Sequence, residues 1–228
     1  MTEEHRFRAQ NGTELPYLLY LPDEPLRMGE RLPMIFYLHG AGSRGNDLSI
    51  LIRNGLPGMI LRGEFHYRCI VVAPQCPEEM VWLYYIRELR ELADFAAAEY
   101  PADPDRIALT GLSMGGFGSW ELAAYAPERF SCLAALCGGG MSWRASRLVN
   151  MPIRAFHGGK DPVVPPVYSR LMVDAVNACG GNAVLTIYPE DEHNCWDDTY
   201  QRSDAIEWML AQKRTAPPEP EAFTGENP

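Results

Sequence analysis

A serine flanked by glycines stands near the middle of the 228-residue chain, in the segment GLSMG at residues 111–115. A serine hydroxyl attacks a carbonyl carbon only when a base takes its proton and the backbone holds its oxygen exposed. The pattern G-x-S-x-G meets the second requirement, because its serine sits on a sharp turn from a strand into a helix. Here an apolar run at residues 107–110 precedes the turn and helical spacing begins at Met114. The pattern therefore predicts that Ser113 is a nucleophile.

A second glycine-rich turn, GAGSRG at residues 40–45, follows another apolar run. It matches the dinucleotide-binding pattern G-x-G-x-x-G, but that site needs a helix opening on the turn, and no clear helical pattern begins there. The segment around Ser113 matches neither nucleotide-binding pattern. The nucleotide-binding alternative is therefore the weaker interpretation of both turns.

The base for such a serine is expected after it in the chain, in the order Ser, then Asp or Glu, then His. Two of the five histidines, His157 and His193, lie after Ser113. His193 is in the loop between the last predicted strand and the final predicted helix, where it can return over the serine. His157 ends an earlier predicted strand and is expected to be structural. The sequence predicts His193 as the base.

The acid that orients the base is predicted to be Asp161, in the turn that follows the predicted strand at residues 153–156. A buried carboxylate there can accept the proton of the imidazole nitrogen that faces away from the serine. The rival acids Glu190, Asp191 and Glu192 are close to His193 in sequence and cannot easily reach behind its ring. They are expected to form a solvated acidic turn.

The oxyanion of an acyl-transfer intermediate needs backbone N–H donors that already point at it. One is expected from Met114, directly after the nucleophile, and the other from Ala41 in the loop after the predicted strand at residues 34–38. His39 begins that loop, and we assign it no role in proton transfer.

These residues must be held by a sheet, and the apolar runs of the chain predict one. The runs do not alternate with polar residues, which is typical of parallel strands buried on both faces. Segments with helical spacing lie between them, so the fold class is α/β. The predicted strands are residues 34–38, 69–73, 107–110, 132–136, 153–156 and 184–188, and the predicted helices are residues 83–99, 114–125, 167–179 and 199–212.

An antiparallel hairpin is predicted to open the fold, from residues 5–10 and 14–21 around the turn dipeptide Asn11-Gly12. The chain length fits one domain, which we place at residues 1–212. Residues 213–228 are rich in proline and glutamate, lack an apolar face and are predicted to be a flexible tail without an assigned function.

The composition of the chain argues against several classes of binding partner. The net charge of −10 opposes binding to nucleic acid, which needs clustered Lys and Arg. No apolar stretch approaches the ~20 residues that cross a bilayer, and the N-terminus lacks the pattern of a secretory signal, so we expect a cytoplasmic protein without membrane insertion. The six cysteines have no metal-ligand spacing. We therefore expect no metal and no cofactor.

Five segments, taken together, resemble the small α/β-hydrolase esterases related to the catalytic domain of prolyl oligopeptidases, whose members are described as carboxylesterases, phospholipases or feruloyl esterase-like. The resemblance covers about residues 15–210 and keeps the order of the family. The segments are HGAGSRGNDL (39–48), APQCP (73–77), DPDRIALTGLSMGGFGSW (103–120), FHGGKDPVVP (156–165) and DEHNCW (191–196).

The resemblance implies the α/β-hydrolase fold: a mostly parallel eight-stranded sheet with helices on both faces and no large lid domain. It also implies the triad Ser113, Asp161 and His193, with Ala41 and Met114 as oxyanion donors. A substrate cleft lined by three side chains is a further implication, and these are Gln75, Trp82 and Trp196.

The expected function is hydrolysis of small carboxylic esters, such as acyl groups on sugars or phenolic esters, by a serine carboxylesterase. An aminopeptidase or dipeptidase, or a lysophospholipase, would use the same triad and stays an alternative. A binding module without catalysis is a third, less favoured alternative, since a fold alone does not give a function. The sequence carries no signal for the oligomeric state.

Overall fold

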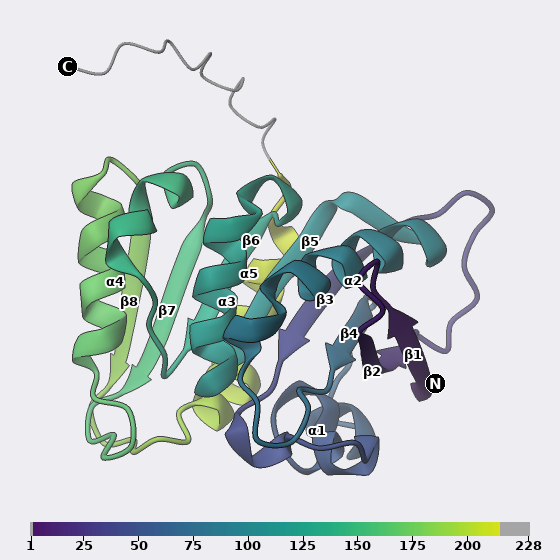
Figure 1. Ribbon diagram of the computed structural model, residues 1–228, viewed down its shortest axis with the longest axis horizontal. Coiled ribbons are helices and arrows are strands. Elements are labelled where there is room, and N and C mark those ends of the chain that lie inside the picture. The colour runs from purple at the N-terminus through teal and green to yellow at the C-terminus, as the bar shows by residue number, and fades with distance from the viewer. Residues whose placement is uncertain (1, 215–228) are drawn as a thin grey trace, which may run out of the picture.

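Residues 2–214, which the computed structural model describes, form one eight-stranded sheet with helices packed on both of its faces (Figure 1). The strand order is β1-β2-β4-β3-β5-β6-β7-β8. Strands β3 to β8 run parallel, while β1 and β2 pair as an antiparallel hairpin at one edge. The strands are β1 (Thr2–Arg8), β2 (Glu14–Tyr20), β3 (Leu32–Leu38), β4 (Ile70–Pro74), β5 (Ala102–Leu112), β6 (Cys132–Leu136), β7 (Ile153–Gly158) and β8 (Ala183–Tyr188). The predicted fold class and the edge hairpin are confirmed.

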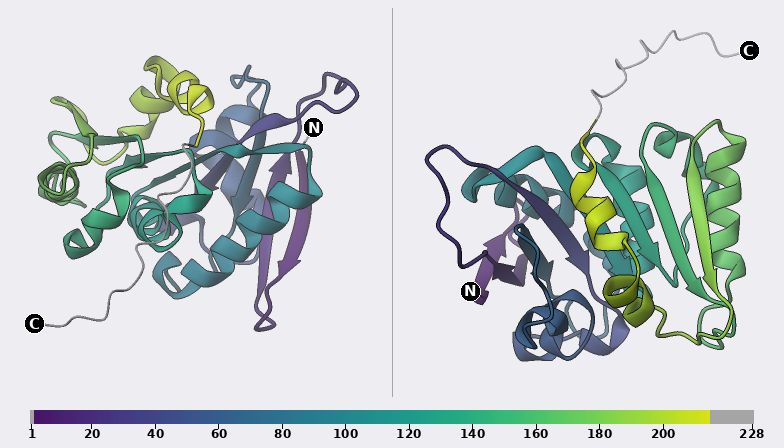
Figure 2. Two further views of the ribbon diagram at one scale, coloured as in Figure 1. Left: turned by 90° about the horizontal axis from the view of Figure 1, so that it is seen from above. Right: turned by 180° about the vertical axis from the view of Figure 1, so that it is seen from behind.

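The helices divide between the two faces of the sheet. Helices α2 (Ile86–Glu99), α3 (Met114–Tyr125) and α4 (Val167–Ala178) cover one face, and α1 (Gly55–Leu61) and α5 (Ala205–Ala211) lie on the other (Figure 2). Short helical turns join them: η1 (Ala41–Ser43), η2 (Leu48–Arg53), η3 (Trp82–Tyr85), η4 (Pro127–Arg129), η5 (Ser142–Leu148) and the π-helical η6 (Asp198–Arg202). None of the helices within residues 2–214 is long and apolar enough to cross a membrane.

The central strand β3 shows why the strand sequences are apolar without alternation. All of its residues are buried. Phe36 and its alternate neighbours face the core beneath α2, α3 and α4, whereas Ile35 and Tyr37 face the core beneath α1 and α5. A strand covered by helices on both faces needs apolar side chains at every position.

Four elements differ from the sequence-based expectation. Strand β5 starts at Ala102, five residues earlier than predicted, because Ala102 pairs with Leu32 and Ile107 with Met34, and the segment Asp103-Pro104-Asp105 forms a register irregularity between these pairs. The predicted helix at residues 83–99 is divided between η3 and α2. Helix α1 was not predicted. The predicted final helix at residues 199–212 is divided between η6 and α5.

The described chain ends against the sheet. Arg214, which the sequence places in the predicted tail, donates to the carboxylate of Asp105 at 2.7 Å and to the backbone carbonyl of Glu128. The rest of the predicted tail, residues 215–228, lies outside the described residues.

Candidate active site

Four loops meet at one edge of the sheet, because the carboxyl ends of parallel strands point the same way. Ala41 follows β3, Ser113 follows β5, Asp161 follows β7 and His193 follows β8. Loops at this edge are where open α/β sheets bind ligands. The topology therefore delivers these four residues to a common site.

The turn at Ser113 has a backbone conformation that a side chain rarely adopts, with φ 55° and ψ −120°. Such a conformation costs on the order of 1–3 kcal/mol and persists only where its surroundings hold it. The amide of Ser113 donates to the carbonyl of Leu136 at 3.0 Å, which ties the turn to β6. A Cβ added at Gly115 would lie 2.0 Å from the carbonyl oxygen of Leu38, and one at Gly111 would lie 2.4 Å from the oxygen of Gly115. Close approach of backbone to backbone therefore requires both glycines.

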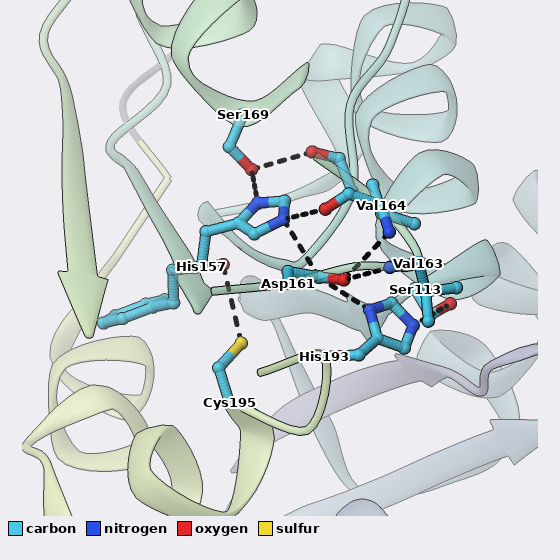
Figure 3. A network of polar contacts seen from close by, with 10 residues as sticks. Ser113, His157, Asp161, Val163, Val164, Ser169, His193 and Cys195 are labelled. Carbon is cyan, nitrogen blue, oxygen red and sulfur yellow. Dashed lines mark hydrogen bonds and ion pairs between the residues drawn. The ribbon is translucent and has the colours of Figure 1, made fainter. Parts of the chain in front are cut away.

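A continuous hydrogen-bonded chain joins Ser113, His193 and Asp161 (Figure 3). The distance from His193 Nε2 to Ser113 Oγ is 2.8 Å, and that from His193 Nδ1 to Asp161 Oδ2 is 2.7 Å. Nδ1 faces a carboxylate and so carries the proton, which leaves Nε2 free to accept from the serine hydroxyl. The arrangement can deprotonate the serine.

The Asp161 carboxylate has no exposed surface, yet it is well supplied with donors. Its Oδ1 accepts the amides of Val163 at 2.8 Å and Val164 at 2.9 Å. Burial on its own would raise the pKa of Asp161, but the hydrogen bonds from His193, Val164 and Val163 outweigh burial and hold that pKa below its ordinary value. The group is therefore an anion at neutral pH.

Two of the rival acids, Glu190 and Asp191, lie in surroundings that differ from those of Asp161. Glu190 is exposed and forms an ion pair with Lys160 at the surface. Burial and the neighbouring Asp198 raise the pKa of Asp191. Asp161, unlike either of them, is within hydrogen-bonding distance of His193.

The two residues expected to supply oxyanion donors, Ala41 and Met114, lie on segments next to Ser113. Met114 is the first residue of α3, and an amide at that position has no acceptor within its own helix. Ala41 is exposed at the start of η1. The preceding Gly40 lies against the nucleophile, since a Cβ added there would be 3.5 Å from Ser113 Cβ. Both N–H groups therefore belong to segments that contact the serine turn.

The loop after β3 is fixed from behind by buried hydrogen bonds. The amide of Cys76 donates to His39 Nε2 at 2.9 Å, so this nitrogen is an acceptor and Nδ1 donates to the carbonyl of Gly40 at 2.6 Å. Burial lowers the pKa of His39 to about 4 and keeps the ring neutral. His39 thus orients the loop as a neutral ring, with both of its nitrogens engaged in hydrogen bonds.

Two of the three residues expected to line a substrate cleft do not do so. Gln75 and Trp82 are 0% exposed. Gln75 Nε2 donates to the carbonyls of Ser43 and Asp47, and Trp82 Nε1 donates to the carbonyl of His39 at 2.9 Å. Their polar groups face the back of the loop, so they support it from inside.

Trp196 has a different position. Its side chain is half-buried, and its ring packs edge-on against His193 with centroids 5.7 Å apart. This contact restricts the orientation of the imidazole ring, and part of the indole remains exposed at the surface.

Sequence reasoning expected His157 to be structural without naming its partner, and it gave no role to Ser169 or to the amides of Val163 and Val164. All of them surround Asp161 directly or through one neighbour (Figure 3). One signal for the amides was present, because an aspartate in a turn commonly accepts from the backbone two residues later. No local pattern indicates the contact with His157.

The sheet has the α/β-hydrolase fold, and comparisons with known proteins give the family. The sequence profile of the Esterase family, described as "Putative esterase", matches residues 9–147, and the chain belongs to this family.

Known relatives agree with this family. An S-formylglutathione hydrolase of Paracoccus denitrificans (strain Pd 1222) is 28% identical over 157 residues, which are 58% of this chain and 54% of that protein. The crystal structure of a thermostable esterase is 33% identical, has a TM-score of 0.80 and covers 93% of this chain and 63% of its own. A feruloyl esterase module from Clostridium thermocellum shares the fold, with 15% identity, a TM-score of 0.73 and coverage of 94% and 89%. The chain spans about half the length of the curated relatives it matches.

The glycine after the nucleophile gives a test of the turn. We expect Gly115→Ala to lower the free energy of unfolding by about 3 kcal/mol, because the added methyl would press on the backbone of β3. Urea denaturation measures this change. Gly42→Ala is the matched control, since a Cβ there meets nothing within 4 Å, and equal stability losses in the two variants would contradict the steric argument.

The support behind the loop gives a second test. Trp82→Phe keeps an aromatic ring but removes the donor to the His39 carbonyl and part of a fully buried side chain, so we expect a loss of about 2–3 kcal/mol in unfolding free energy and faster amide hydrogen exchange in residues 39–47. Trp143→Phe makes the same chemical change at a residue that is 77% exposed and should alter neither quantity. Unchanged exchange in Trp82→Phe would show that the loop does not depend on this bond.

Proposed function

We propose that this protein is a serine hydrolase that cleaves small carboxylic esters through an acyl-enzyme on Ser113. The observation that carries the proposal is the chain of hydrogen bonds from Asp161 through His193 to Ser113, at 2.7 and 2.8 Å. A weak nucleophile, a base that contacts it and an anion that orients the base are the parts that nucleophilic acyl transfer needs.

In the first half of the proposed reaction, the Ser113 oxygen attacks the ester carbonyl while its proton passes to His193 Nε2. The carbonyl oxygen becomes an oxyanion and accepts the amides of Ala41 and Met114. The imidazolium of His193 is stabilised by the Asp161 carboxylate. Collapse of the intermediate breaks the bond to the alcohol, which leaves with the proton from His193.

In the second half, water replaces the alcohol. His193 takes a proton from the water as its oxygen attacks the acyl carbon, and the bond to Ser113 breaks as the proton returns to the serine oxygen. The carboxylic acid is released and the enzyme is regenerated. These steps use the protein, the ester and water, and they require no metal or cofactor.

The proposed substrates are small esters, including acyl groups on sugars and phenolic esters. Support comes from the names of similar proteins, a thermostable esterase and an S-formylglutathione hydrolase. The connection between β6 and β7 also favours a short substrate, because its helical part is η5 alone, and no inserted lid domain covers the site there. A panel of acetyl, long-chain acyl, feruloyl and sugar esters, with aminoacyl anilides and a lysophospholipid, distinguishes esterase from peptidase and phospholipase.

Removal of the nucleophile tests the proposal directly. We expect Ser113→Ala to abolish turnover of p-nitrophenyl acetate and labelling by a fluorophosphonate probe, because no other hydroxyl contacts His193 Nε2 among the interactions of residues 2–214. Ser146→Ala, an exposed serine on η5, serves as the control and should keep both. Full turnover in a folded Ser113→Ala protein would overturn the assignment.

Removal of the orienting charge tests the acid. We expect Asp161→Asn to lower kcat by about 10⁴-fold, since the amide favours the wrong tautomer of His193. Glu190→Gln and Asp191→Asn alter the rival acids and should leave kcat within about twofold of the parent, well short of the tenfold change that 1.36 kcal/mol of barrier gives. A large loss in either of these and not in Asp161→Asn would move the role to the acidic turn.

A further inference from the structure

A second histidine contacts the same carboxylate oxygen as the proposed base. His157, near the end of β7, is 0% exposed, and its Nε2 lies 3.2 Å from Asp161 Oδ2 and 2.8 Å from the carbonyl oxygen of Val164 (Figure 3). On the other side of the ring, Nδ1 lies 2.7 Å from Ser169 Oγ in α4. The Ser169 oxygen is also 2.7 Å from the carbonyl oxygen of Gly138.

The partners of the ring decide where its proton is. A carbonyl and a carboxylate can only accept, so a bare Nε2 would place its lone pair against two oxygens. Nε2 must therefore carry hydrogen. Ser169 donates its single hydroxyl hydrogen to the carbonyl of Gly138, so its oxygen can accept a hydrogen from Nδ1 but has none to give to it. Burial lowers the pKa of His157 more than its contacts with Val164 and Asp161 raise it.

We propose that His157 is a positioning residue for the catalytic aspartate, because its Nε2–H group faces the Asp161 oxygen that also faces His193. This inference rests on the proposed function. Asp161 Oδ1 accepts the amides of Val163 and Val164, while Oδ2 lies 2.7 Å from His193 Nδ1 and 3.2 Å from His157 Nε2, whose nearer acceptor is the Val164 carbonyl. These contacts on both oxygens restrict rotation of the carboxylate and keep Oδ2 directed at His193.

Two further titratable groups act on this pair. His193 faces Asp161 from the loop after β8, and its charged form opposes charging of His157. The thiol of Cys137, which follows β6, interacts with Asp161, and burial raises the pKa of that thiol, which stays neutral over the working range. The ammonium of Lys160 is directed to Glu190 at the surface.

Three variants test the role by kinetics. His157→Phe keeps a ring but removes the donor, and we expect kcat/KM to fall about 10- to 100-fold, the range for one hydrogen bond to a charged group. The acidic limb of the pH profile of kcat/KM should also move to higher pH, because a carboxylate with one donor fewer stabilises the His193 imidazolium more strongly. His157→Gln can place an N–H group near the Nε2 position and should restore the parent limb. Ser169→Ala removes the contact with His157 Nδ1 but not the one between Nε2 and Asp161, so the acidic limb of the pH profile should stay at the parent pH.

A measurement on the unmodified protein keeps the test independent of folding and of catalysis. Two-bond ¹H–¹⁵N correlations of labelled histidines should show a hydrogen on His157 Nε2 from pH 5 to 9, with Asp161→Asn as the assignment aid. A bare Nε2, or a His157→Phe protein that folds and keeps the parent pH profile, would overturn the proposal. Failure of the Ser113→Ala test is a separate result, since it would remove the proposed function and leave the tautomer unchanged.

Discussion

The buried carboxylate of Asp161 is the charge on which the arrangement of the site depends. Removal of an isolated carboxylate from water costs on the order of tens of kcal/mol in a medium of low dielectric constant, so a buried one must be supplied with donors or lose its charge. Here the donors are two consecutive amides of the turn after β7 and two imidazole rings. The turn sequence Asp161-Pro162-Val163-Val164 and the positions of both histidines follow from this requirement.

The sheet brings the hydrogen-bond donors to Asp161, because it carries segments that are remote in sequence to one edge. His157 and Asp161 come from β7 and the turn after it, and His193 comes from the loop after β8, which pairs with β7 in parallel. The serine arrives from β5, two strands away, and its amide bonds to Leu136 at the end of the intervening β6. Parallel pairing in register therefore sets the separation of the loops, and side-chain hydrogen bonds set the final geometry.

Local sequence predicts the parts of this structure that local physics decides. The turn at Ser113, strand β6 and helix α3 have the predicted positions, because glycine spacing, an uninterrupted apolar run and helical periodicity are all encoded within a few residues. Helix α1 was missed since GLPGMIL contains two glycines and a proline, and burial of five of its residues stabilises a helix that propensity does not favour. Gln75 and Trp82 were expected to line the substrate cleft, but both are buried behind the loop after β3. The sequence gives a residue's position along the chain and not the direction of its side chain.

The two histidines on Asp161 show how one residue type takes two states within a single hydrogen-bonded group. His193 keeps 19% of its side chain exposed and contacts a serine hydroxyl, so its Nε2 can take up a proton, which in the proposed reaction leaves with the alcohol. His157 is fully buried, and its Nε2 lies between two acceptors, the Val164 carbonyl and the Asp161 carboxylate. These acceptors hold a hydrogen on Nε2 of His157, while partial exposure lets His193 exchange its proton. In the proposed reaction the carboxylate between the two rings therefore stays ionised while His193 changes charge.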